Sequence, residues 1–146
     1  MSKTIVLATD HAGFELKEHV KKFLLEKGFE IKDFGALEYD ALDDYPDFII
    51  PASKFVSENK LIGIIFGGSG QGEAIAANRI KGIRAVVFYN GPDDIIELSR
   101  MHNNANILSI GARFVDNHRA EEIINLWLST TFEEGRHQKR ISKLDS

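Results

Sequence analysis

Five short runs rich in β-branched residues recur along the chain, and longer stretches with helical periodicity separate them. We predict that each run forms a strand: TIVLAT (4–9), FEIKDF (29–34), LIGIIF (61–66), IRAVVF (83–88) and ANILSI (105–110). Their nearly continuous apolar character is typical of strands that are buried on both faces of a parallel sheet. The alternation predicts an α/β fold, a doubly wound, Rossmann-like parallel sheet of five strands, for which we expect the strand order 2-1-3-4-5.

Helical stretches with one apolar face lie between these runs. In the first stretch, Leu16, Val20 and Leu24 recur at spacings of four residues. Only three prolines punctuate the chain, and no segment repeats. We therefore expect a single domain, residues 1–146, whose C-terminal helical arm spans about 132–146.

Composition removes several classes of function. The 146 residues include no cysteine, which excludes thiol nucleophiles, zinc knuckles and disulfide frameworks. The formal net charge of -4 argues against a protein that coats nucleic acid or an anionic membrane. The apolar run at 4–8 is too short for a signal peptide or a membrane span. We expect a cytoplasmic enzyme with no nucleic-acid and no membrane partner.

The loops beyond the carboxyl ends of the strands should hold the site, because ligands of doubly wound sheets bind there, where the strand order changes direction. The loops after the first, third and fourth predicted strands are the candidates. They contain Asp10-His11-Ala12-Gly13, the segment GGSGQGE at 67–73, and the stretch from Phe88 to His102-Asn103.

The glycine-rich segment GGSGQGE directly precedes a helical stretch. Glycines permit positive φ angles and close backbone approach, so Gly68, Gly70 and Gly72 can help to aim backbone N–H groups at one anion. The segment lacks the lysine of a Walker loop, and Glu73 stands where the G-x-G-x-x-G pattern requires its last glycine. A tight strand-to-helix turn, with glycines that serve only packing, is the alternative interpretation.

Glu73 lies in the first turn of the predicted helix. The helix dipole stabilises a carboxylate there, which by itself accounts for the residue. The other interpretation is a general base beside amides that hold an enediolate oxygen. A base that works at neutral pH benefits from a raised pKa, so burial in a closed pocket would have to offset the dipole. Both interpretations remain open from the local sequence.

Two histidine-containing segments are further candidates, each with a structural alternative. Asp10 and His11 follow the first strand, where they can contact a ligand, or Asp10 can cap a helix. His102 and Asn103 can contact a ligand as well, or they can end a helix, a position that both residue types favour.

The C-terminal arm contains Arg136 and Arg140, which share one face of a helix because they are four residues apart. Two guanidinium groups on one face suit a phosphate, and a solvated tail of mixed charge is the alternative. The preceding helix, around 119–128, should run about 15 Å away from the carboxyl edge of the sheet. The arginines can therefore serve a partner subunit's crevice more easily than their own.

Five segments, taken together, closely resemble the ribose-5-phosphate isomerase B and galactose-6-phosphate isomerase subunit family, in order and over nearly the whole chain. They are DHAGFELK, DYPDF, GGSGQGEAIAANRIKGIRA, SRMHNNANILSIGAR and EEGRHQKRI. The resemblance implies the fold predicted above and a carbohydrate-metabolic isomerase of the pentose phosphate pathway. The usual reaction interconverts ribose 5-phosphate and ribulose 5-phosphate through a cis-enediolate, without a cofactor or a metal.

The resemblance also assigns roles to residues. Many members use a cysteine just before the glycine-rich segment as the base, where this chain has Gly67, so the chain is similar to the branch in which a glutamate, here Glu73, takes over. The other implied site residues are Ser69 with the backbone of Gly68, Gly70, Gln71 and Gly72 around the substrate and its enediolate oxygen; His102, with Asp10 nearby, for opening the furanose ring; Asn103 and Tyr45 for hydroxyls; and His11, Arg113, Arg136 and Arg140 for the phosphate. The last two would come from a neighbouring subunit, which implies a homodimer or a dimer of dimers with shared sites.

Two alternatives remain at this point. The first is an isomerase of a hexose 6-phosphate, of the allose or galactose type. A galactose-type subunit needs an unlike partner, whereas this chain carries Glu73, His102 and both arm arginines, which favours a self-sufficient homo-oligomer. The second is a non-catalytic domain that binds a sugar phosphate or a nucleotide, because a fold alone does not determine function.

Overall fold

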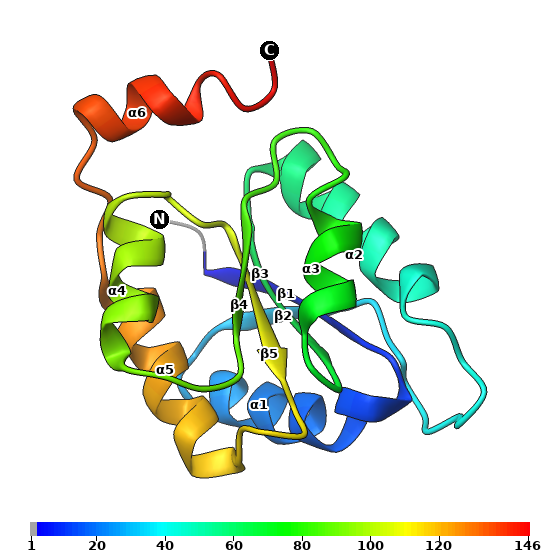
Figure 1. Ribbon diagram of the computed structural model, residues 1–146. Coiled ribbons are helices and arrows are strands. Elements are labelled where there is room, and N and C mark those ends of the chain that lie inside the picture. Colours follow the sequence, from blue (N-terminus) through cyan, green and yellow to red (C-terminus); the bar gives the residue numbers. More distant parts are fainter. Residues whose placement is uncertain (1–2) are drawn as a thin grey trace.

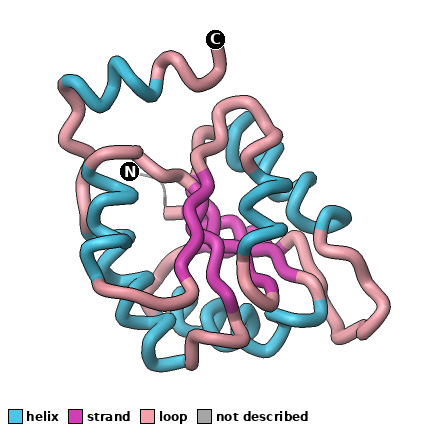
Figure 2. The backbone as a smooth tube through the Cα atoms, viewed as in Figure 1, coloured by secondary structure: helices cyan, strands magenta, loops and turns pink. Residues whose placement is uncertain are grey.

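Five parallel strands form one sheet, and helices cover both of its faces (Figures 1 and 2). The computed structural model describes residues 3–146. The strands are β1 (Thr4–Thr9), β2 (Glu30–Asp33), β3 (Ile62–Gly67), β4 (Ala85–Phe88) and β5 (Ile107–Gly111). The helices are η1 (His11–Gly13, a 3-10 turn), α1 (Phe14–Glu26), α2 (Pro46–Asn59), α3 (Gln71–Ala77), α4 (Asp93–Met101), α5 (Asn117–Ser129) and α6 (Arg136–Ile141). The predicted parallel α/β fold of five strands is confirmed.

The predicted strand order is wrong at one edge of the sheet, because the observed order is β2-β1-β3-β5-β4. β5 pairs with β3 from Gly63↔Ile107 to Gly67↔Gly111, and β4 pairs only with β5. Every residue of β5 is buried, whereas three of the four residues of β4 are partly exposed, which agrees with an interior and an edge position. The swap places the loop after β5 beside the loop after β3.

Burial on both faces, expected for all five strands, holds only for the interior ones. β1, β3 and β5 are almost entirely buried. β2 alternates between exposed and half-buried residues, beginning with the exposed Glu30, because it is an edge strand. Edge strands need only one protected face, and charged residues on them discourage pairing with other chains.

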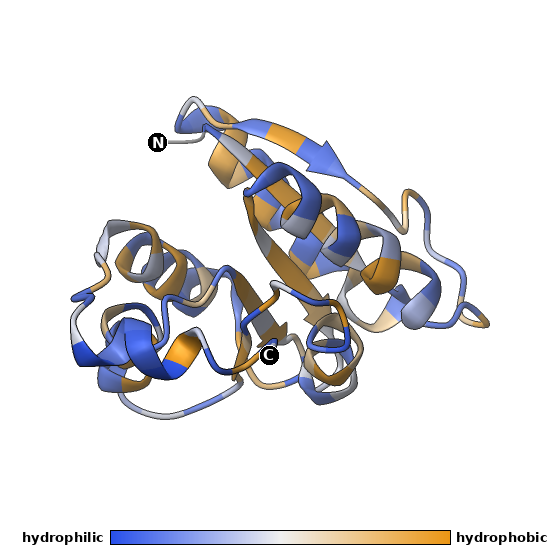
Figure 3. Cartoon of the chain, turned by 90° about the horizontal axis from the view of Figure 1, so that it is seen from above, coloured by the Kyte–Doolittle hydropathy of each residue, from blue (hydrophilic) through white to orange (hydrophobic). Residues whose placement is uncertain are grey.

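The core divides into two layers, one on each face of the sheet. On one face, α1, α4 and α5 bury apolar side chains such as Leu24, Ile96 and Trp127 against the strands. On the other face, α2 and α3 contribute Val56 and Ala77, among others. Figure 3 shows the hydrophobic central strands enclosed between these helices. Among the described residues, no helix has both the length and the apolar character that a membrane crossing requires.

The C-terminal arm, with α6, lies at the end of the sheet opposite the strand arrowheads (Figure 1). The backbone N–H of Glu133 donates to the carbonyl of Met101, which anchors the start of the arm to the end of α4. Among residues 136–146, His137 alone is buried. The arm therefore presents most of its side chains, including Arg136 and Arg140, to the exterior of this chain.

Candidate active site

The carboxyl ends of β1, β3 and β5 form the floor of the candidate site. The backbone N–H groups of Ala112 and Arg113, directly after β5, donate to the carbonyls of Gly67 and Gly68 at 2.7 and 3.1 Å. The hydroxyl of Ser109 donates to the carbonyl of Gly70 at 2.6 Å. Because β5 lies beside β3, these hydrogen bonds hold the glycine-rich loop in place.

The glycine-rich loop enters α3 through Gly70, whose φ of 78° is in the left-handed region that favours glycine. The loop also packs tightly against its neighbours. A Cβ on Gly111 would lie 2.6 Å from the carbonyl oxygen of Ser69, so glycine there permits the close approach of the two loops. The hydroxyl of Ser69 accepts a long hydrogen bond, 3.4 Å, from the N–H of Gln71.

The Glu73 side chain folds back from α3 toward the end of β3. Its carboxylate occupies the space in front of Gly67, where a Cβ would lie 2.0 Å from Oε2. Only 5% of Glu73 is exposed. Burial raises the pKa of its carboxyl group, the group's own backbone N–H opposes that rise, and the negative charge of Asp10 adds to it. Burial therefore outweighs the helix dipole, and the pKa of Glu73 is raised, as a general base requires.

Asp10 and His11 follow the end of β1, at the same edge of the sheet as Glu73. Asp10 caps η1, because its Oδ1 accepts from the N–H of Ala12 at 3.0 Å. The helix-cap interpretation of Asp10 is therefore correct, and the negative charge of its carboxylate also raises the pKa of Glu73. Gly13 lets η1 pack against β3, since a Cβ there would lie 2.5 Å from the Cβ of Phe66.

Asp43 is a further candidate residue, which the sequence interpretation did not single out. Its Oδ1 accepts from the backbone N–H of His11 at 2.9 Å and lies 2.7 Å from the Nδ1 of the same residue. This hydrogen bond is the main cause that raises the pKa of His11, and the charge of Asp10 contributes. The only available signal was the position of Asp43 two residues before the predicted Tyr45, within a segment rich in acidic residues.

Tyr45, at the start of α2, and Arg113, just after β5, both lie beside the glycine-rich loop. A Cβ on Gly72 would lie 2.9 Å from the Tyr45 hydroxyl oxygen, and a Cβ on Gly68 would lie 3.1 Å from Nε and Cζ of Arg113. Both glycines therefore leave room for side chains that the sequence predicted to contact substrate. The structure brings together the predicted residues Asp10, His11, Tyr45, Gly68, Ser69, Gly70, Gln71, Gly72, Glu73 and Arg113 at one edge of the sheet.

His102 and Asn103 do not belong to this cluster within one chain. α4 begins after the carboxyl end of β4 and runs back along the sheet for nine residues, about 13 Å. His102 follows its last residue and stacks on His137 of the arm, with ring centroids 4.2 Å apart. The expectation that His102 lies near Asp10 is thus wrong for a single chain, because α4 carries His102 to the arm's end of the sheet.

Two groups of side chains within residues 3–146 place three possible metal-ligand atoms within 4.8 Å of one another. The first, Asp10, His11 and Asp43, lies at the carboxyl edge of the sheet, where Nδ1 of His11 is 2.7 Å from Oδ1 of Asp43. The second consists of His102, Glu133 and His137 and lies at the arm.

Comparison with known proteins places the chain in a family. The family model described as "Ribose/Galactose Isomerase" matches residues 5–144. The chain belongs to this family. It is 39% identical over 146 residues to the probable ribose-5-phosphate isomerase B of Mycoplasma genitalium, covering 99% of this chain and 95% of the relative. The ribose-5-phosphate isomerase B of Mycobacterium tuberculosis strain H37Rv is 41% identical, with coverage of 96% and 86%.

Solved structures of ribose-5-phosphate isomerase B are also similar to this chain. Ribose-5-phosphate isomerase B of Clostridium thermocellum superposes with a TM-score of 0.92 at 38% identity and covers 97% of this chain and 95% of its own. The Mycoplasma genitalium enzyme with bound ribulose-5-phosphate has a TM-score of 0.91 at 38% identity, with coverage of 97% and 93%. The family resemblance inferred from the five sequence segments is confirmed.

Proposed function

We propose that this chain is an aldose–ketose isomerase that interconverts ribose 5-phosphate and ribulose 5-phosphate through a cis-enediolate. Its family and its relatives support the reaction, and the ribulose-5-phosphate held by a structure of the same fold supports the substrate. The observation that carries the proposal is the buried Glu73 carboxylate, directed over Gly67 beside a loop of glycines.

Glu73 is the proposed base that moves the proton between C2 and C1. An α-hydroxy carbon acid ionises too slowly in water, so the site must supply a positioned base and stabilise the enediolate. The raised pKa makes the Glu73 carboxylate a stronger proton acceptor than an exposed one. Gly67 allows the carboxylate to lie where other family members, by the resemblance described above, have a cysteine.

The glycine-rich loop is the proposed electrophile. Backbone N–H groups at the start of a helix point outward without intrahelical partners, and fixed donors of this kind stabilise developing negative charge. Ser69 and the backbone of Gly70, Gln71 and Gly72 would hold the enediolate oxygen in this proposal. Tyr45, which packs over Gly72, would hold a hydroxyl. The proposed reaction needs no cofactor or metal, because the amides supply the electrostatic stabilisation.

The phosphate would be bound by cations from two subunits. His11 and Arg113 lie at the carboxyl edge of the sheet, and the side chains of the exposed Arg136 and Arg140 make no hydrogen bond or ion pair to residues 3–146 of their own chain. We propose a homodimer, or a dimer of such dimers, in which the arm of one subunit closes the crevice of the other.

The same arrangement would restore the proposed ring-opening pair. His102 and Asn103 lie beside the arm, so an arm that enters the partner's crevice brings them with it. His102 would then meet Asp10 of the other subunit and move protons between the ring oxygen and O1, while Asn103 would hold a hydroxyl. We place this enzyme of sugar-phosphate metabolism in the cytoplasm.

The reaction can be tested by the formation of ribulose 5-phosphate from ribose 5-phosphate in the presence of EDTA. We expect fast turnover that EDTA does not change. If the protein turns over allose 6-phosphate or galactose 6-phosphate but not ribose 5-phosphate, the proposed mechanism stands and the proposed substrate is wrong. If the protein binds sugar phosphates but isomerises none of them, the isomerase proposal is wrong and the chain is a non-catalytic binding domain.

Asp43→Asn should raise the KM for ribose 5-phosphate about 10-fold at neutral pH, the size expected when one charge-assisted hydrogen bond is lost. Asparagine still accepts the backbone N–H of His11, but the variant loses the carboxylate that raises the pKa of His11. Because His11 then loses its proton at a lower pH, the KM of the variant should begin to rise at a lower pH than that of the wild type. At acidic pH, where both imidazoles are protonated, the two KM values should converge.

KM measured between about pH 5 and pH 8, with the titration of the His11 ring followed by NMR, checks this expectation. Asp40→Asn is the matched control, because Asp40 acts on His11 only through a weaker, longer-range charge effect. An unchanged His11 titration in Asp43→Asn would show that Asp43 does not control the charge of His11.

A further inference from the structure

The segment that carries His102 and Asn103 ends in a tight turn at Asn104. The φ angle of Asn104 is 46°, in the left-handed region that asparagine adopts more readily than most residues with a side chain. Its backbone N–H donates to the carbonyl of Arg100 at 3.1 Å, which closes the turn on the end of α4. The placement of His102 and Asn103 therefore depends on how this turn is held.

The side chain of Arg100, in the last turn of α4, contacts both this turn and the end of α5. Its Nη1 donates to the carbonyl of Ala105 and, at 3.3 Å, to Oδ1 of Asn104. Its Nε donates to the carbonyl of Thr130, the residue that directly follows α5, at 3.3 Å. One guanidinium group thus joins the turn after Asn103 to the segment that leads into the C-terminal arm.

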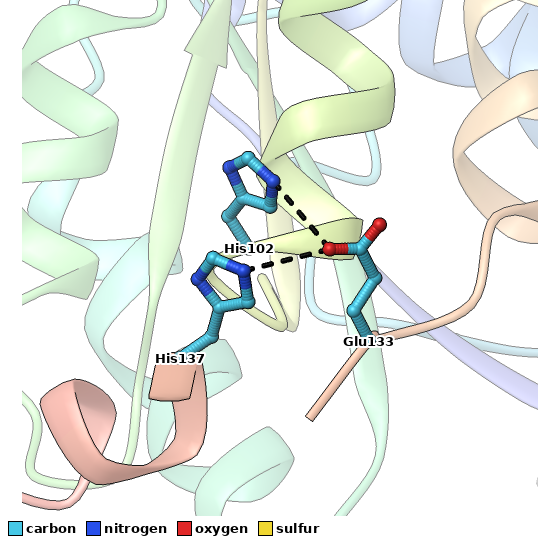
Figure 4. Close-up of side chains that lie close together, drawn as sticks. All are labelled: His102, Glu133 and His137. Atoms are coloured by element: carbon cyan, nitrogen blue, oxygen red, sulfur yellow. Dashed lines mark ion pairs between the residues drawn. The ribbon is translucent and has the colours of Figure 1, made fainter. Parts of the chain in front are cut away.

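The arm and the end of α4 also contact each other directly. Glu133 lies in the segment before α6, and its Oε1 is 3.6 Å from Nε2 of His102 and 3.5 Å from Nε2 of His137 (Figure 4). The two imidazole rings lie side by side in the same view (Figure 4). The arm and the His102–Asn103 segment therefore form one unit, and a shift of the turn at Asn104 would move them relative to each other.

An ion pair does not explain why Arg100 is partly buried. Within residues 3–146 it makes no ion pair with a carboxylate. Burial lowers the pKa of its guanidinium group, and the positive charge of Arg84 adds to this effect. The guanidinium carbon lies 5.6 Å from the centre of the Trp127 ring. A buried charge without a countercharge is unfavourable, so the contacts of Arg100 with the turn and with α5 remain as the reason for its position.

Arginine suits these contacts better than lysine does. Its planar guanidinium group holds several N–H donors in a fixed arrangement, whereas the lysine ammonium is a compact group on a flexible stem. Arg84 holds the same turn from the side of β4, since its Nε donates to the carbonyl of Asn104 at 2.9 Å. Two arginines therefore fix Asn104 from different elements.

We propose that Arg100 is a positioning residue of the isomerase, which holds the His102–Asn103 segment and the arm in the arrangement that completes the partner subunit's site. Arg100 itself does not contact the substrate. This inference rests on the proposed function and on the proposed sharing of sites between subunits.

Arg100→Lys should lower kcat/KM for ribose 5-phosphate about 10- to 100-fold, because misplacement of site residues by about 1 Å can cost this much. The variant keeps the positive charge and loses the fixed geometry of the donors. Because both His102 and the arm arginines would shift, kcat should fall and KM should rise, as measured by steady-state kinetics. Thermal unfolding of the variant checks that it is folded.

Mixed dimers separate a positioning role from general damage to the subunit. In the proposed dimer, Arg100 serves the partner's site, and Glu73 serves the site at its own carboxyl edge. A mixed dimer of Arg100→Lys and Glu73→Gln subunits then has one intact site, so about half of the wild-type activity should return. If Arg100→Lys instead damaged its whole subunit, that subunit's carboxyl edge would fail as well and activity would not return.

A mixed dimer of Arg100→Lys and His102→Asn is the matched control, because each of its sites receives one altered arm side and activity should stay low. Arg119→Lys is the control for the substitution itself. Arg119 links the start of α5 to the start of α4, with Nη2 2.8 Å from Oδ1 of Asp93, so its replacement should leave kcat/KM unchanged.

The inference is overturned if Arg100→Lys has the wild-type kcat/KM. It is also overturned if the Arg100→Lys and Glu73→Gln dimer stays inactive while a mixed dimer of Glu73→Gln and His102→Asn recovers activity. If neither dimer recovers, the sharing of sites between subunits is wrong, and the inference fails together with that part of the proposed function.

Discussion

Glu73→Gln should lower kcat for ribose 5-phosphate isomerisation by about 10²- to 10⁴-fold, the usual contribution of a positioned general base. Glutamine has nearly the same shape and can occupy the space over Gly67 that the carboxylate now fills. The substrate should still bind, because the cations that we propose for phosphate binding are unchanged. We therefore expect the loss in kcat with little change in KM, measured by steady-state kinetics at neutral pH.

The same substitution should stabilise the folded protein. Burial raises the pKa of Glu73, so the folded state holds this proton more tightly than the unfolded state does. The ionised carboxylate consequently destabilises the fold above its raised pKa, and the penalty disappears as the pH falls through that value. Glutamine removes the charge, so we expect a gain at neutral pH of up to about 1 kcal/mol, or a rise in Tm of about 2–4 °C.

Glu58→Gln, at an exposed position of α2, is the control and should change neither kcat nor Tm. Thermal unfolding at neutral pH and again near pH 4 measures the stability effect, which should shrink at the lower pH. A Glu73→Gln variant with wild-type turnover would refute the assignment of the base. A variant that loses activity and also unfolds at lower temperature would indicate a structural role.

Two inactive variants should restore activity when they form a mixed dimer. In the proposed dimer, each site combines the crevice of one subunit with the arm of the other. A mixed dimer of Glu73→Gln and His102→Asn subunits then has one doubly altered site and one intact site, so we expect about half of the wild-type activity per dimer. The measurement is the turnover of mixed dimers isolated by two different affinity tags after co-expression.

A mixed dimer of Glu73→Gln and Asp10→Asn is the matched control. Asp10 and Glu73 lie at the same carboxyl edge of one subunit, so each site of this dimer keeps one alteration and activity should not return. No recovery in the Glu73→Gln and His102→Asn dimer, or full activity of an isolated monomer, would show that the site is not shared between subunits.

The carboxyl-edge part of the candidate site was predictable because its signals are local. A β-branched run followed by glycines and a helical period identifies the strand, loop and helix that position Glu73, and the structure has each of them at the predicted place. The structure adds the decisive observation that the carboxylate is buried over Gly67. Before that, a helix-turn carboxylate and a general base were equally consistent with the sequence.

Asp43 and the cluster at the arm were not predictable in the same way. Asp43 contacts His11, which is 32 positions away in the sequence. His102 stacks on His137, which is 35 positions away (137 − 102). No spacing rule connects such pairs, because their contacts depend on how the elements pack. Sequence periodicity says which face of a helix is apolar, but not which neighbour each end of the helix will meet.

The sequence by itself determined the elements, the parallel α/β class, the family and the loop segments that meet at the carboxyl edge of the sheet, because hydrophobic periodicity, glycine turns and ordered motifs act over short distances along the chain. The tertiary structure decided the order of β4 and β5, the burial of Glu73 and the separation of His102 from Asp10. β4 and β5 are both apolar enough to lie beside β3, so their order depends on which strand buries more surface and permits the close contact of Gly111 with Ser69. These choices depend on the packing of distant segments against one another, a free-energy balance that local sequence patterns do not contain.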